Sequence, residues 1–279
     1  MRFWKMNGAG NDFLILNDLE EQLPEAHLPQ IARTLCHRQL SIGADGLMVV
    51  KPPRQGGDYR MLFYNSDGSL GEMCGNGARC ICRYGYEMGL AGERQTVETT
   101  AGIVTGQRMD RRLYRIRLND PTVVKLDYPV EAGGVTYPCA YVELGDPGIP
   151  HAVVPFPGLR QAEESTIREL GRTLRWHKAF PRGANVNFYE ITGPDRLYER
   201  TFERGVEDLT YACGTGTGSV VTVLTLLGKV SGRNVRADMT GGQLIVDAEQ
   251  AGGRIADLYL TGPTNLVAKG EVTDEDLVL

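Results

Sequence analysis

Residues 74–89 read CGNGARCICRYGYEMG, and residues 213–228 read CGTGTGSVVTVLTLLG. Each stretch begins with a cysteine and a Gly-x-Gly turn, continues as a run of helical character and ends at a glycine. The two cysteines and the two closing glycines are each 139 residues apart. The same offset carries Asn65 onto Arg204, each nine residues before its cysteine. The repeat predicts a duplicated half-domain.

A cysteine in front of such a turn lies in a specific electrostatic environment. Glycines let a ligand approach the backbone closely, and the first amides of a helix have no partner inside the helix. Those amides and the positive end of the helix dipole bind a carboxylate, and the same field stabilises a neighbouring thiolate. If the two halves face each other, one sulfur removes an α-proton and the other protonates the opposite face of the carbon. This pattern predicts a racemase.

Other interpretations of the two turns stay open on the residues alone. A single Cys-Gly-x-Gly is also typical of a buried cysteine beside a tight turn. A Gly-rich turn can bind phosphate, but neither copy has the P-loop ending or the Rossmann pattern. Cys74, Cys80 and Cys82 lack the C-x-x-C pair typical of a zinc site. The matched duplication favours the catalytic interpretation, and we expect no metal.

Length and composition limit the class of protein. The 279 residues are 42% apolar and 23% charged, enough for a sizeable core in one large or two medium domains. A net charge of −5 without a basic block argues against nucleic-acid binding. No stretch approaches the length of a membrane span, the start lacks a signal-peptide pattern, and six cysteines do not make a disulfide framework. We therefore expect a cytoplasmic enzyme that binds neither nucleic acid nor membrane.

The first part of the chain predicts a hairpin followed by a helix. Two apolar runs, 2–6 and 13–16, flank an Asn-Gly turn. The polar side chains of this turn either shape the turn alone or face a ligand. Apolar residues at helical spacing then predict a helix over 28–39, with His37 near its end and without a catalytic role.

The remaining elements repeat this order. Strands are predicted over 59–64, 96–118, 185–188 and 197–203. The pattern starts again near Pro121, and a second helix is expected over 163–175. The run 219–227 is almost wholly apolar; its valines suit a strand, but its position in the repeat favours a helix buried on all sides. The segment 264–272 is expected to return to the first half as a strand.

Several short motifs, taken together, resemble the diaminopimelate epimerase family. They are KMNGAGNDF (5–13), Asn65 with DGS (67–69), CGNGAR (74–79), NVNF (185–188), ERG (203–205) and ACGTG (212–216). The resemblance extends from residue 5 to residue 218. It implies an enzyme that interconverts LL- and meso-diaminopimelate without pyridoxal phosphate or metal, on the bacterial route to lysine and peptidoglycan.

The resemblance also implies a fold. It is of the α/β (α+β) class, with two pseudo-symmetric domains, each a rolled, mostly antiparallel sheet around a central helix. We place the first half at 1–120 plus about 264–279 and the second at 121–263, with the active site in the cleft between them. The family resemblance further implies a homodimer that acts on a small amino-acid substrate.

The resemblance assigns roles to individual residues. It implies that Cys74 and Cys213 are the acid/base pair. Backbone amides expected to hold the reacting carboxylate are those of Gly75, Asn76, Gly214 and Thr215. Side chains expected to bind the substrate's ammonium group and distal carboxylate are those of Asn11, Asn65, Asn187, Glu203 and Arg204. His151 and Glu203 match family positions that tune the thiols, and the planar fork of an arginine suits a carboxylate.

Two positions depart from the family pattern. Ile149 stands where members commonly have an asparagine before the Pro-His pair, and Gly46 stands where some members have glutamine. One neutral hydrogen bond contributes about 0.5–1.5 kcal/mol, so diaminopimelate stays the favoured substrate. A racemase of another amino acid, histidine included, is the alternative on the same fold. A noncatalytic amino-acid-binding protein is the rival from a different class.

Overall fold

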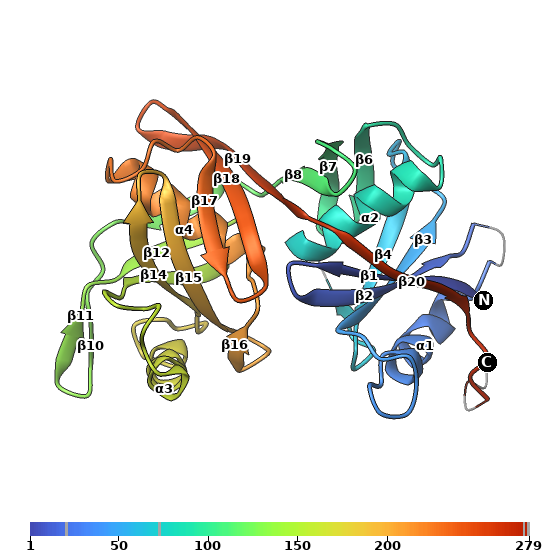
Figure 1. Ribbon diagram of the computed structural model, residues 1–279, viewed down its shortest axis with the longest axis horizontal. Coiled ribbons are helices and arrows are strands. Elements are labelled where there is room, and N and C mark those ends of the chain that lie inside the picture. Colours follow the sequence, from blue (N-terminus) through green and yellow to red (C-terminus); the bar gives the residue numbers. More distant parts are fainter. Residues whose placement is uncertain (20–21, 72–73, 276, 278–279) are drawn as a thin grey trace. The chain divides into compact units, whose positions relative to one another are not determined.

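The chain forms two compact units of mostly strands with few helices (Figure 1). The computed structural model describes residues 1–19, 22–71, 74–275 and 277. Unit 1 comprises Met1–Ile116 and Gly262–Leu279, and unit 2 comprises Arg117–Thr261. Each unit is a mixed α/β structure with its own buried helix, and the strands of each unit are described by themselves below.

The sheet of unit 1 is rolled and mostly antiparallel. Its strands are β1 (Arg2–Gly8), β2 (Asn11–Asn17), β3 (Gly46–Lys51), β4 (Tyr59–Asn65), β5 (Leu70–Gly71), β6 (Arg94–Thr99), β7 (Gly102–Arg108), β8 (Leu113–Arg117) and β20 (Asn265–Glu271). They pair in the order β20-β1-β2-β3-β4-β6-β7-β8, with β5 on β4. The pairs β2–β3 and β4–β6 are parallel. The pairing of β20 with β1 confirms the predicted return of the last strand to the first half of the chain.

The sheet of unit 2 repeats this topology. Its strands are β9 (Pro121–Lys125), β10 (Val130–Ala132), β11 (Val135–Tyr137), β12 (Ala140–Leu144), β13 (Ile149–Pro155), β14 (Asn185–Gly193), β15 (Arg196–Glu203), β16 (Asp208–Thr210), β17 (Val235–Met239), β18 (Gly242–Ala251) and β19 (Arg254–Pro263). The order is β9-β12-β13-β14-β15-β17-β18-β19, with β16 on β15 and a separate β10–β11 hairpin. The parallel pairs β13–β14 and β15–β17 occupy the places of β2–β3 and β4–β6.

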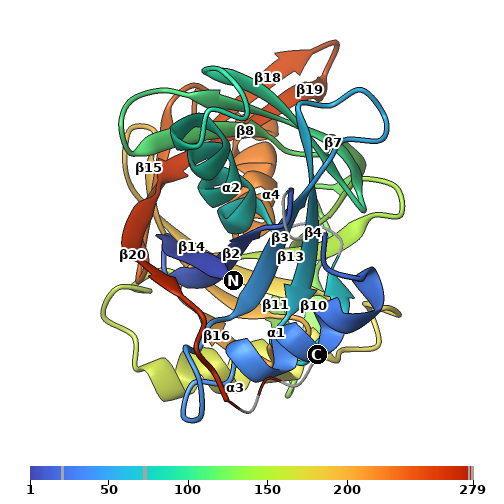
Figure 2. The same cartoon turned by 90° about the vertical axis from the view of Figure 1, so that its right-hand side faces the viewer.

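Each unit has one outer and one inner helix. The helices are α1 (Leu28–Leu35), preceded by the short η1 (Glu25–His27), α2 (Gly75–Glu87), α3 (Glu164–Arg175) and α4 (Gly214–Leu226). In unit 1, α1 packs on β3 and β4, whereas α2 packs on β1, β2 and β7 from the other side (Figures 1 and 2). In unit 2, α3 packs on β14 and β15, and α4 lies against β12, β13, β14 and β18. The run of helical character after Cys74 is helix α2, and the helix expected over 163–175 is α3, so both predictions are confirmed.

Helix α4 is buried on all sides, as the repeat predicts. Residues 216–225 are all buried, although Val220, Val221 and Val223 have the β-branched side chains typical of strands. Two hydroxyl groups of this helix bond to the preceding turn: Thr217 Oγ1 donates to the carbonyl of Cys213 at 2.9 Å, and Ser219 Oγ donates to that of Thr215 at 2.9 Å. Burial of an apolar helix within a sheet therefore outweighs local strand propensity here.

The first hairpin is confirmed, with its loop at Ala9 and Gly10. Gly8 pairs with Asn11, so the connection between β1 and β2 is a two-residue loop. Ala9 and Gly10 both have positive φ, 56° and 100°, as a hairpin turn that matches the strand twist requires. Asn11 is therefore the first residue of β2 and directly follows the turn.

Helix α1 ends four residues earlier than predicted. It stops at Leu35, and Cys36 is its C-cap. Beyond it, the amide of Ser41 donates to the carbonyl of His37, and the amide of Leu40 donates to His37 Nδ1 at 3.2 Å. Leu40, which would continue the apolar stripe, is 76% exposed. The predicted end at residue 39 was wrong because nothing apolar holds a further turn on the core, and His37 lies outside the helix.

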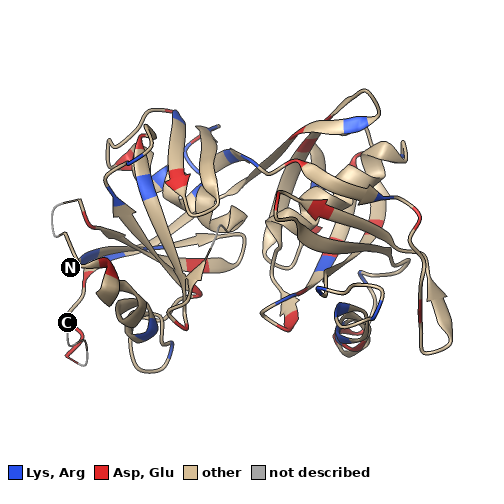
Figure 3. Cartoon of the chain, turned by 180° about the vertical axis from the view of Figure 1, so that it is seen from behind, with Lys and Arg blue, Asp and Glu red and all other residues tan. Residues whose placement is uncertain are grey.

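Charges of both signs are interspersed along the strands and loops of each unit (Figure 3). Among the described residues, no helix has the length and apolar character needed to cross a membrane.

Candidate active site

Cys74 is the N-cap residue of α2, in an extended conformation with φ −116° and ψ 119°. Its side chain is half-buried. The amide of Ala78 donates to its carbonyl at 2.7 Å, which closes the first turn of the helix. A Cβ atom on Gly77 would lie 2.2 Å from Met48 Cε, so the glycine lets this turn pack directly on β3.

Cys213 has the same position in α4, with φ −122° and ψ 107°. It is 7% exposed. A Cβ atom on Gly216 would lie 2.1 Å from Asn187 Oδ1, so this turn packs on β14 as the first packs on β3. Thr215 Oγ1 lies 3.6 Å from the sulfur. Both helices have 13 residues, and the 139-residue offset carries one onto the other from N-cap to C-cap.

The environment of Cys213 opposes its thiolate. Burial raises the pKa of this thiol well above its ordinary value, and the charge of Glu203 raises it further. Hydrogen bonds from the Thr215 hydroxyl and the Gly216 amide act in the opposite direction. The expectation that the helix N-terminus lowers the thiol pKa is wrong for Cys213, because desolvation and a nearby carboxylate outweigh it.

A buried arginine lies behind the Cys74 turn. Arg79 is fully buried on α2, and its Nη2 donates to Asn76 Oδ1 at 2.9 Å. Its Nη1 also lies 3.4 Å from the carbonyl of Gly75. Burial lowers the pKa of Arg79 to about 10, while electrostatic interaction with Cys80 and Cys74 raises it. The guanidinium is therefore cationic at neutral pH.

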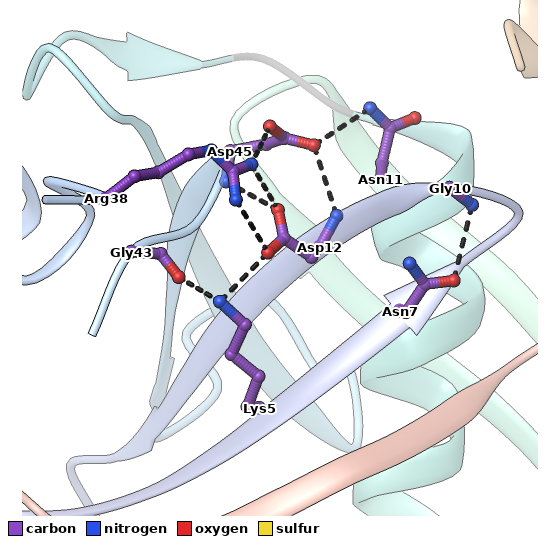
Figure 4. Close-up of polar contacts among 8 residues, drawn as sticks. All are labelled: Lys5, Asn7, Gly10, Asn11, Asp12, Arg38, Gly43 and Asp45. Atoms are coloured by element: carbon purple, nitrogen blue, oxygen red, sulfur yellow. Dashed lines mark hydrogen bonds and ion pairs between the residues drawn. The ribbon is translucent and has the colours of Figure 1, made fainter. Parts of the chain in front are cut away.

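Asn11 and Asn76 are brought together in unit 1. Asn76 Nδ2 donates to Asn11 Oδ1 at 2.5 Å. Figure 4 shows the other contact of this side chain, in which Asn11 Nδ2 donates to Asp45 Oδ2 at 3.2 Å. Arg38 Nη2 holds the other oxygen of Asp45 at 2.6 Å. The amide of Asp12 also donates to Asp45 Oδ2, at 3.1 Å. This arrangement fixes the Asn11 side chain between the α2 turn and an ion pair.

The ion pairs behind Asn11 include Asp12. Burial opposes ionisation of this carboxyl, but hydrogen bonds and charges of Arg38 and Lys5 outweigh it, so the pKa of Asp12 lies below its ordinary value. Lys5 Nζ lies 2.9 Å from Asp12 Oδ2 and also bonds to the carbonyl of Gly43 (Figure 4). The other predicted side chain of unit 1, Asn65, lies at the exposed end of β4 and donates to Ser69 Oγ at 2.9 Å.

Asn187 is fully buried in unit 2, and the protein engages both ends of its amide. Nδ2 donates to the carbonyls of Ala152 at 3.0 Å and Asn185 at 3.3 Å, and lies 3.3 Å from His151 Nδ1. Oδ1 accepts from Thr201 Oγ1 at 3.1 Å. The side chain therefore ties β13, β14 and β15 together beneath the Cys213 turn.

His151 is a neutral, buried imidazole. Burial lowers its pKa to about 3, and the charge of Arg204 acts in the same direction. Its Nε2 is buried and has no hydrogen-bond partner among the described residues. The backbone amide of Arg204 donates to Asn185 Oδ1 at 2.8 Å. The Nη1 atom of the Arg204 side chain lies 3.4 Å from the carbonyl of Arg182. Thus His151, Asn187, Glu203 and Arg204 are grouped around the base of one turn.

The other cysteines of α2 are structural. Cys80 and Cys82 are fully buried, and burial raises the pKa of each thiol to about 12. Within the described ranges, no group of three or more His, Cys, Asp or Glu side chains is placed to hold a metal ion.

Comparison with known proteins identifies the family. The family model of diaminopimelate epimerase matches residues 3–115 and 145–267. The chain belongs to the diaminopimelate epimerase family. The diaminopimelate epimerase of Aquifex aeolicus is 34% identical over 288 residues, covering 99% of each chain. That of Moorella thermoacetica is 37% identical over 288 residues, covering 97% of this chain and 99% of the relative.

A solved structure agrees with the fold of this family. A probable proline racemase from Agrobacterium radiobacter K84 has a TM-score of 0.69 and 17% identity, and the match covers 98% of this chain and 92% of that one. The recognised family and the predicted α/β fold class are confirmed. As a member of the diaminopimelate epimerase family, the chain is an isomerase.

The two residues that depart from the diaminopimelate epimerase pattern, Ile149 and Gly46, both lie at the first position of a strand. Ile149 is the first residue of β13, as Asn11 is of β2, so the two occupy matching ends of the two hairpins. Gly46 starts β3, and a Cβ atom there would lie 2.5 Å from Phe63 Cε2 and 2.7 Å from the carbonyl of Tyr64. The ring of Phe63 thus fills the space that a longer side chain at position 46 needs.

Two buried ionisable residues beside the cysteine turns were given no role by the sequence. They are Arg79 on α2 and Glu199 on β15, which are 0% and 2% exposed. Leu197, Glu199 and Thr201 are every second residue of β15 and are all buried on one face of the strand. This period-two alternation was the available indication for Glu199. An arginine among the small and apolar residues of α2 was the indication for Arg79.

Proposed function

We propose that the chain interconverts LL- and meso-diaminopimelate, with Cys74 of unit 1 and Cys213 of unit 2 acting on the same α-carbon. The observation that carries this proposal is the pair of 13-residue helices, one in each unit, that both begin directly after a cysteine. Full-length similarity to diaminopimelate epimerases supports the choice of substrate.

The proposed reaction uses no group outside the chain. The reacting carboxylate binds the N-terminal amides of the two helices, at Gly75 and Asn76 and at Gly214 and Thr215. One thiolate takes the α-proton, and the electron pair left on the carbon is stabilised by the amides and the dipoles that hold the carboxylate. The opposite thiol then gives its proton to the other face of the carbon and becomes the thiolate, so the reverse reaction starts from that sulfur.

The remaining predicted residues are proposed to bind the rest of the substrate. Arg204 is half-buried at the end of β15, where its planar fork suits the distal carboxylate. Asn11 and Asn65 are proposed to bind the distal ammonium and carboxylate with Glu203. Asn187 and His151 are fully buried, which supports a role in holding the Cys213 turn and its electrostatics.

The charges behind the two turns support a definite resting state. Arg79 interacts with Cys74 as a buried cation, whereas Glu203 and burial hold the pKa of Cys213 high. We therefore propose that Cys74 carries the thiolate and Cys213 the proton in the enzyme that waits for substrate. The homodimer and the cytoplasmic location stay predictions, the first from the family resemblance and the second from composition.

The test is proton exchange at the α-carbon in heavy water. Purified protein kept under reducing conditions is incubated with LL-diaminopimelate, meso-diaminopimelate, histidine, lysine and glutamate in separate reactions. We expect deuterium at one α-carbon of the product from the two diaminopimelate isomers alone. Inverted product without deuterium would refute the two-base mechanism. Turnover of histidine in preference to diaminopimelate would reassign the substrate while keeping the chemistry.

A further inference from the structure

A buried polar cluster lies beneath the Cys213 turn. It consists of five side chains from β13, β14, β15 and α4: His151, Asn187, Glu199, Thr201 and Thr217. None of them is more than 3% exposed. The proposed mechanism uses neither Glu199 nor the two threonines, although Glu199 interacts electrostatically with Cys213. A buried carboxyl at this place requires an explanation.

The hydrogen bonds of the cluster determine which groups donate. Asn187 Nδ2 faces two backbone carbonyls, so the other amide atom, Oδ1, is an acceptor. The Thr201 hydroxyl, 3.1 Å away, donates its hydrogen to that oxygen. The Thr217 hydroxyl donates to the carbonyl of Cys213 at 2.9 Å. Each hydroxyl has a single hydrogen, so neither has a second one for Glu199.

An ionised carboxylate at Glu199 would need hydrogen-bond donors, and among the described residues neither of its oxygens has one. Its Oε1 lies 3.4 Å from Thr201 Oγ1, whose hydrogen is directed to Asn187. Its Oε2 is buried and has no hydrogen-bond partner in the part of the chain that the structure describes. Burial of an unpaired carboxylate is strongly unfavourable, whereas a neutral acid can donate its own hydrogen to a threonine oxygen.

We infer that Glu199 is held as a neutral carboxylic acid behind the Cys213 turn and that its ionisation switches off catalysis at alkaline pH. The inference rests on the proposed function of Cys213. Glu199 is a positioning residue, because it acts on the reaction through the sulfur and the turn and does not contact the substrate. In its neutral form, Glu199 adds no negative charge beside the Cys213 turn.

The direction of the effect follows from the charge. Burial raises the pKa of Glu199 to about 8, and the nearby hydroxyl groups of Thr217 and Thr201 lower it by less than burial raises it. Below that pH the group is neutral, and above it the group is an anion. An anion here raises the pKa of the Cys213 thiol further and repels a carboxylate at the N-terminus of α4. Activity is therefore present below about pH 8 and falls as pH rises through that value.

The other groups around the turn do not reproduce this effect. From β13, His151 stays neutral because its pKa is about 3. The end of β15 contributes the negative charge of Glu203, and Arg204 follows it as a cation. Helix α4 has no ionisable side chain between residues 214 and 226. The packed faces of the neighbouring strands are apolar, with Val142 and Leu144 from β12 and Leu244, Val246 and Ala248 from β18.

The experiment compares the pH dependence of kcat/KM in wild type, Glu199→Gln and the control Glu249→Gln. Glutamine supplies a hydrogen-bond donor in place of the acid and cannot ionise, whereas Glu249 is exposed on β18 of the same unit. With a pKa of about 8, roughly one tenth of Glu199 stays neutral at pH 9, so wild type should lose about tenfold between pH 7 and pH 9. Glu199→Gln should stay within about threefold of wild type at pH 7 and keep that rate to at least about one pH unit higher. Glu249→Gln should follow wild type.

A Glu199→Gln profile that declines at the same pH as wild type would overturn the inference. Wild type that does not epimerise at any pH would instead overturn the proposed function. An infrared spectrum of wild type gives a second measurement that does not depend on folding of the variant. We expect the carbonyl band of one buried neutral carboxylic acid at pH 7, lost as pH rises through about 8. Absence of that band at pH 7 would also refute the inference.

Discussion

The turns before α2 and α4 share a backbone but differ in what lies behind them. Both begin with an extended cysteine as N-cap, and both contain a glycine at the third helical position. Behind Cys74 lies a buried arginine, whereas behind Cys213 lie a buried glutamate and a neutral histidine. The repeated backbone thus gives each sulfur the same position within its unit, and the side chains that are not repeated give the two turns different electrostatic surroundings.

This difference is relevant to a reaction that runs in both directions. Two identical thiols that interact would titrate as a coupled pair, without a defined base and a defined acid. The charge of Arg79 near Cys74 and the charge of Glu203 near Cys213 make the two thiols different. On the proposed mechanism, this asymmetry gives the resting enzyme one favoured protonation state, which is reversed by each turnover.

The largest expected effect comes from removal of either sulfur. Cys74→Ala and Cys213→Ala should each lower kcat by roughly 10²–10⁴-fold, the range for loss of a general acid or base. Each variant should keep deuterium exchange with only one of the two isomers, and the two variants should prefer opposite isomers. The control is Cys139→Ala, a buried thiol of unit 2 outside the turns, which should keep wild-type kcat. Full activity in either single variant would show that the two turns are not a catalytic pair.

The next effect tests the cation behind Cys74. Arg79→Met should lower kcat/KM by about 10–100-fold, because it removes a charged hydrogen bond to Asn76 and the charge that favours the thiolate. Its free energy of unfolding should not fall, because the arginine is buried without a carboxylate partner among the described residues. Arg79→Lys should recover part of the activity.

A matched control for Arg79 lies one turn further along α2. Arg83 bonds to Glu87 at 2.7 Å and to the carbonyl of Thr264 at 3.0 Å. Arg83→Met should therefore lower the free energy of unfolding while leaving kcat/KM near that of wild type. Equal losses of activity in Arg79→Met and Arg83→Met would mean that Arg79 acts on the fold and not on the sulfur.

A smaller effect compares the packing of the two turns. Gly216→Ala places a methyl group against the buried amide of Asn187, whereas Gly77→Ala meets the flexible end of Met48. Overpacking against a fixed group costs about 1–3 kcal/mol, and alanine gains up to about 1 kcal/mol over glycine in a helix. Urea denaturation should show a loss for Gly216→Ala and little change for Gly77→Ala. The reverse order would contradict the rigid contact between α4 and β14.

The smallest effect concerns the matching ends of the two hairpins. Asn11 has an amide where Ile149 has an apolar side chain. Ile149→Asn should lower KM for diaminopimelate by roughly threefold, as expected for one added hydrogen bond of under about 1 kcal/mol. An unchanged KM would indicate that this hairpin end does not contact the substrate. A raised KM would indicate that isoleucine itself packs on the substrate.

The repeat, the helices and most strands could be predicted because their signals are local. Glycine positions, apolar spacing and the offset between Cys74 and Cys213 are all readable in the chain. The end of α1 could not be predicted, since Leu40 continues the apolar spacing but stays exposed. Arg79 and Glu199 could not be assigned because their importance depends on burial, which the surrounding strands create. The prediction of a lowered pKa for Cys213 was wrong for the same reason, because burial raises the pKa of this thiol.

The path of the chain through the two units has a consequence for synthesis on the ribosome. Unit 2 is one continuous segment, Arg117–Thr261, whereas unit 1 receives its edge strand β20 from residues 265–271. Because translation proceeds from the N-terminus, the later half of the chain has all its strands before the earlier half does. During that interval β1 has one unpaired edge, so a chaperone that shields exposed strand edges would act on the half that was made first.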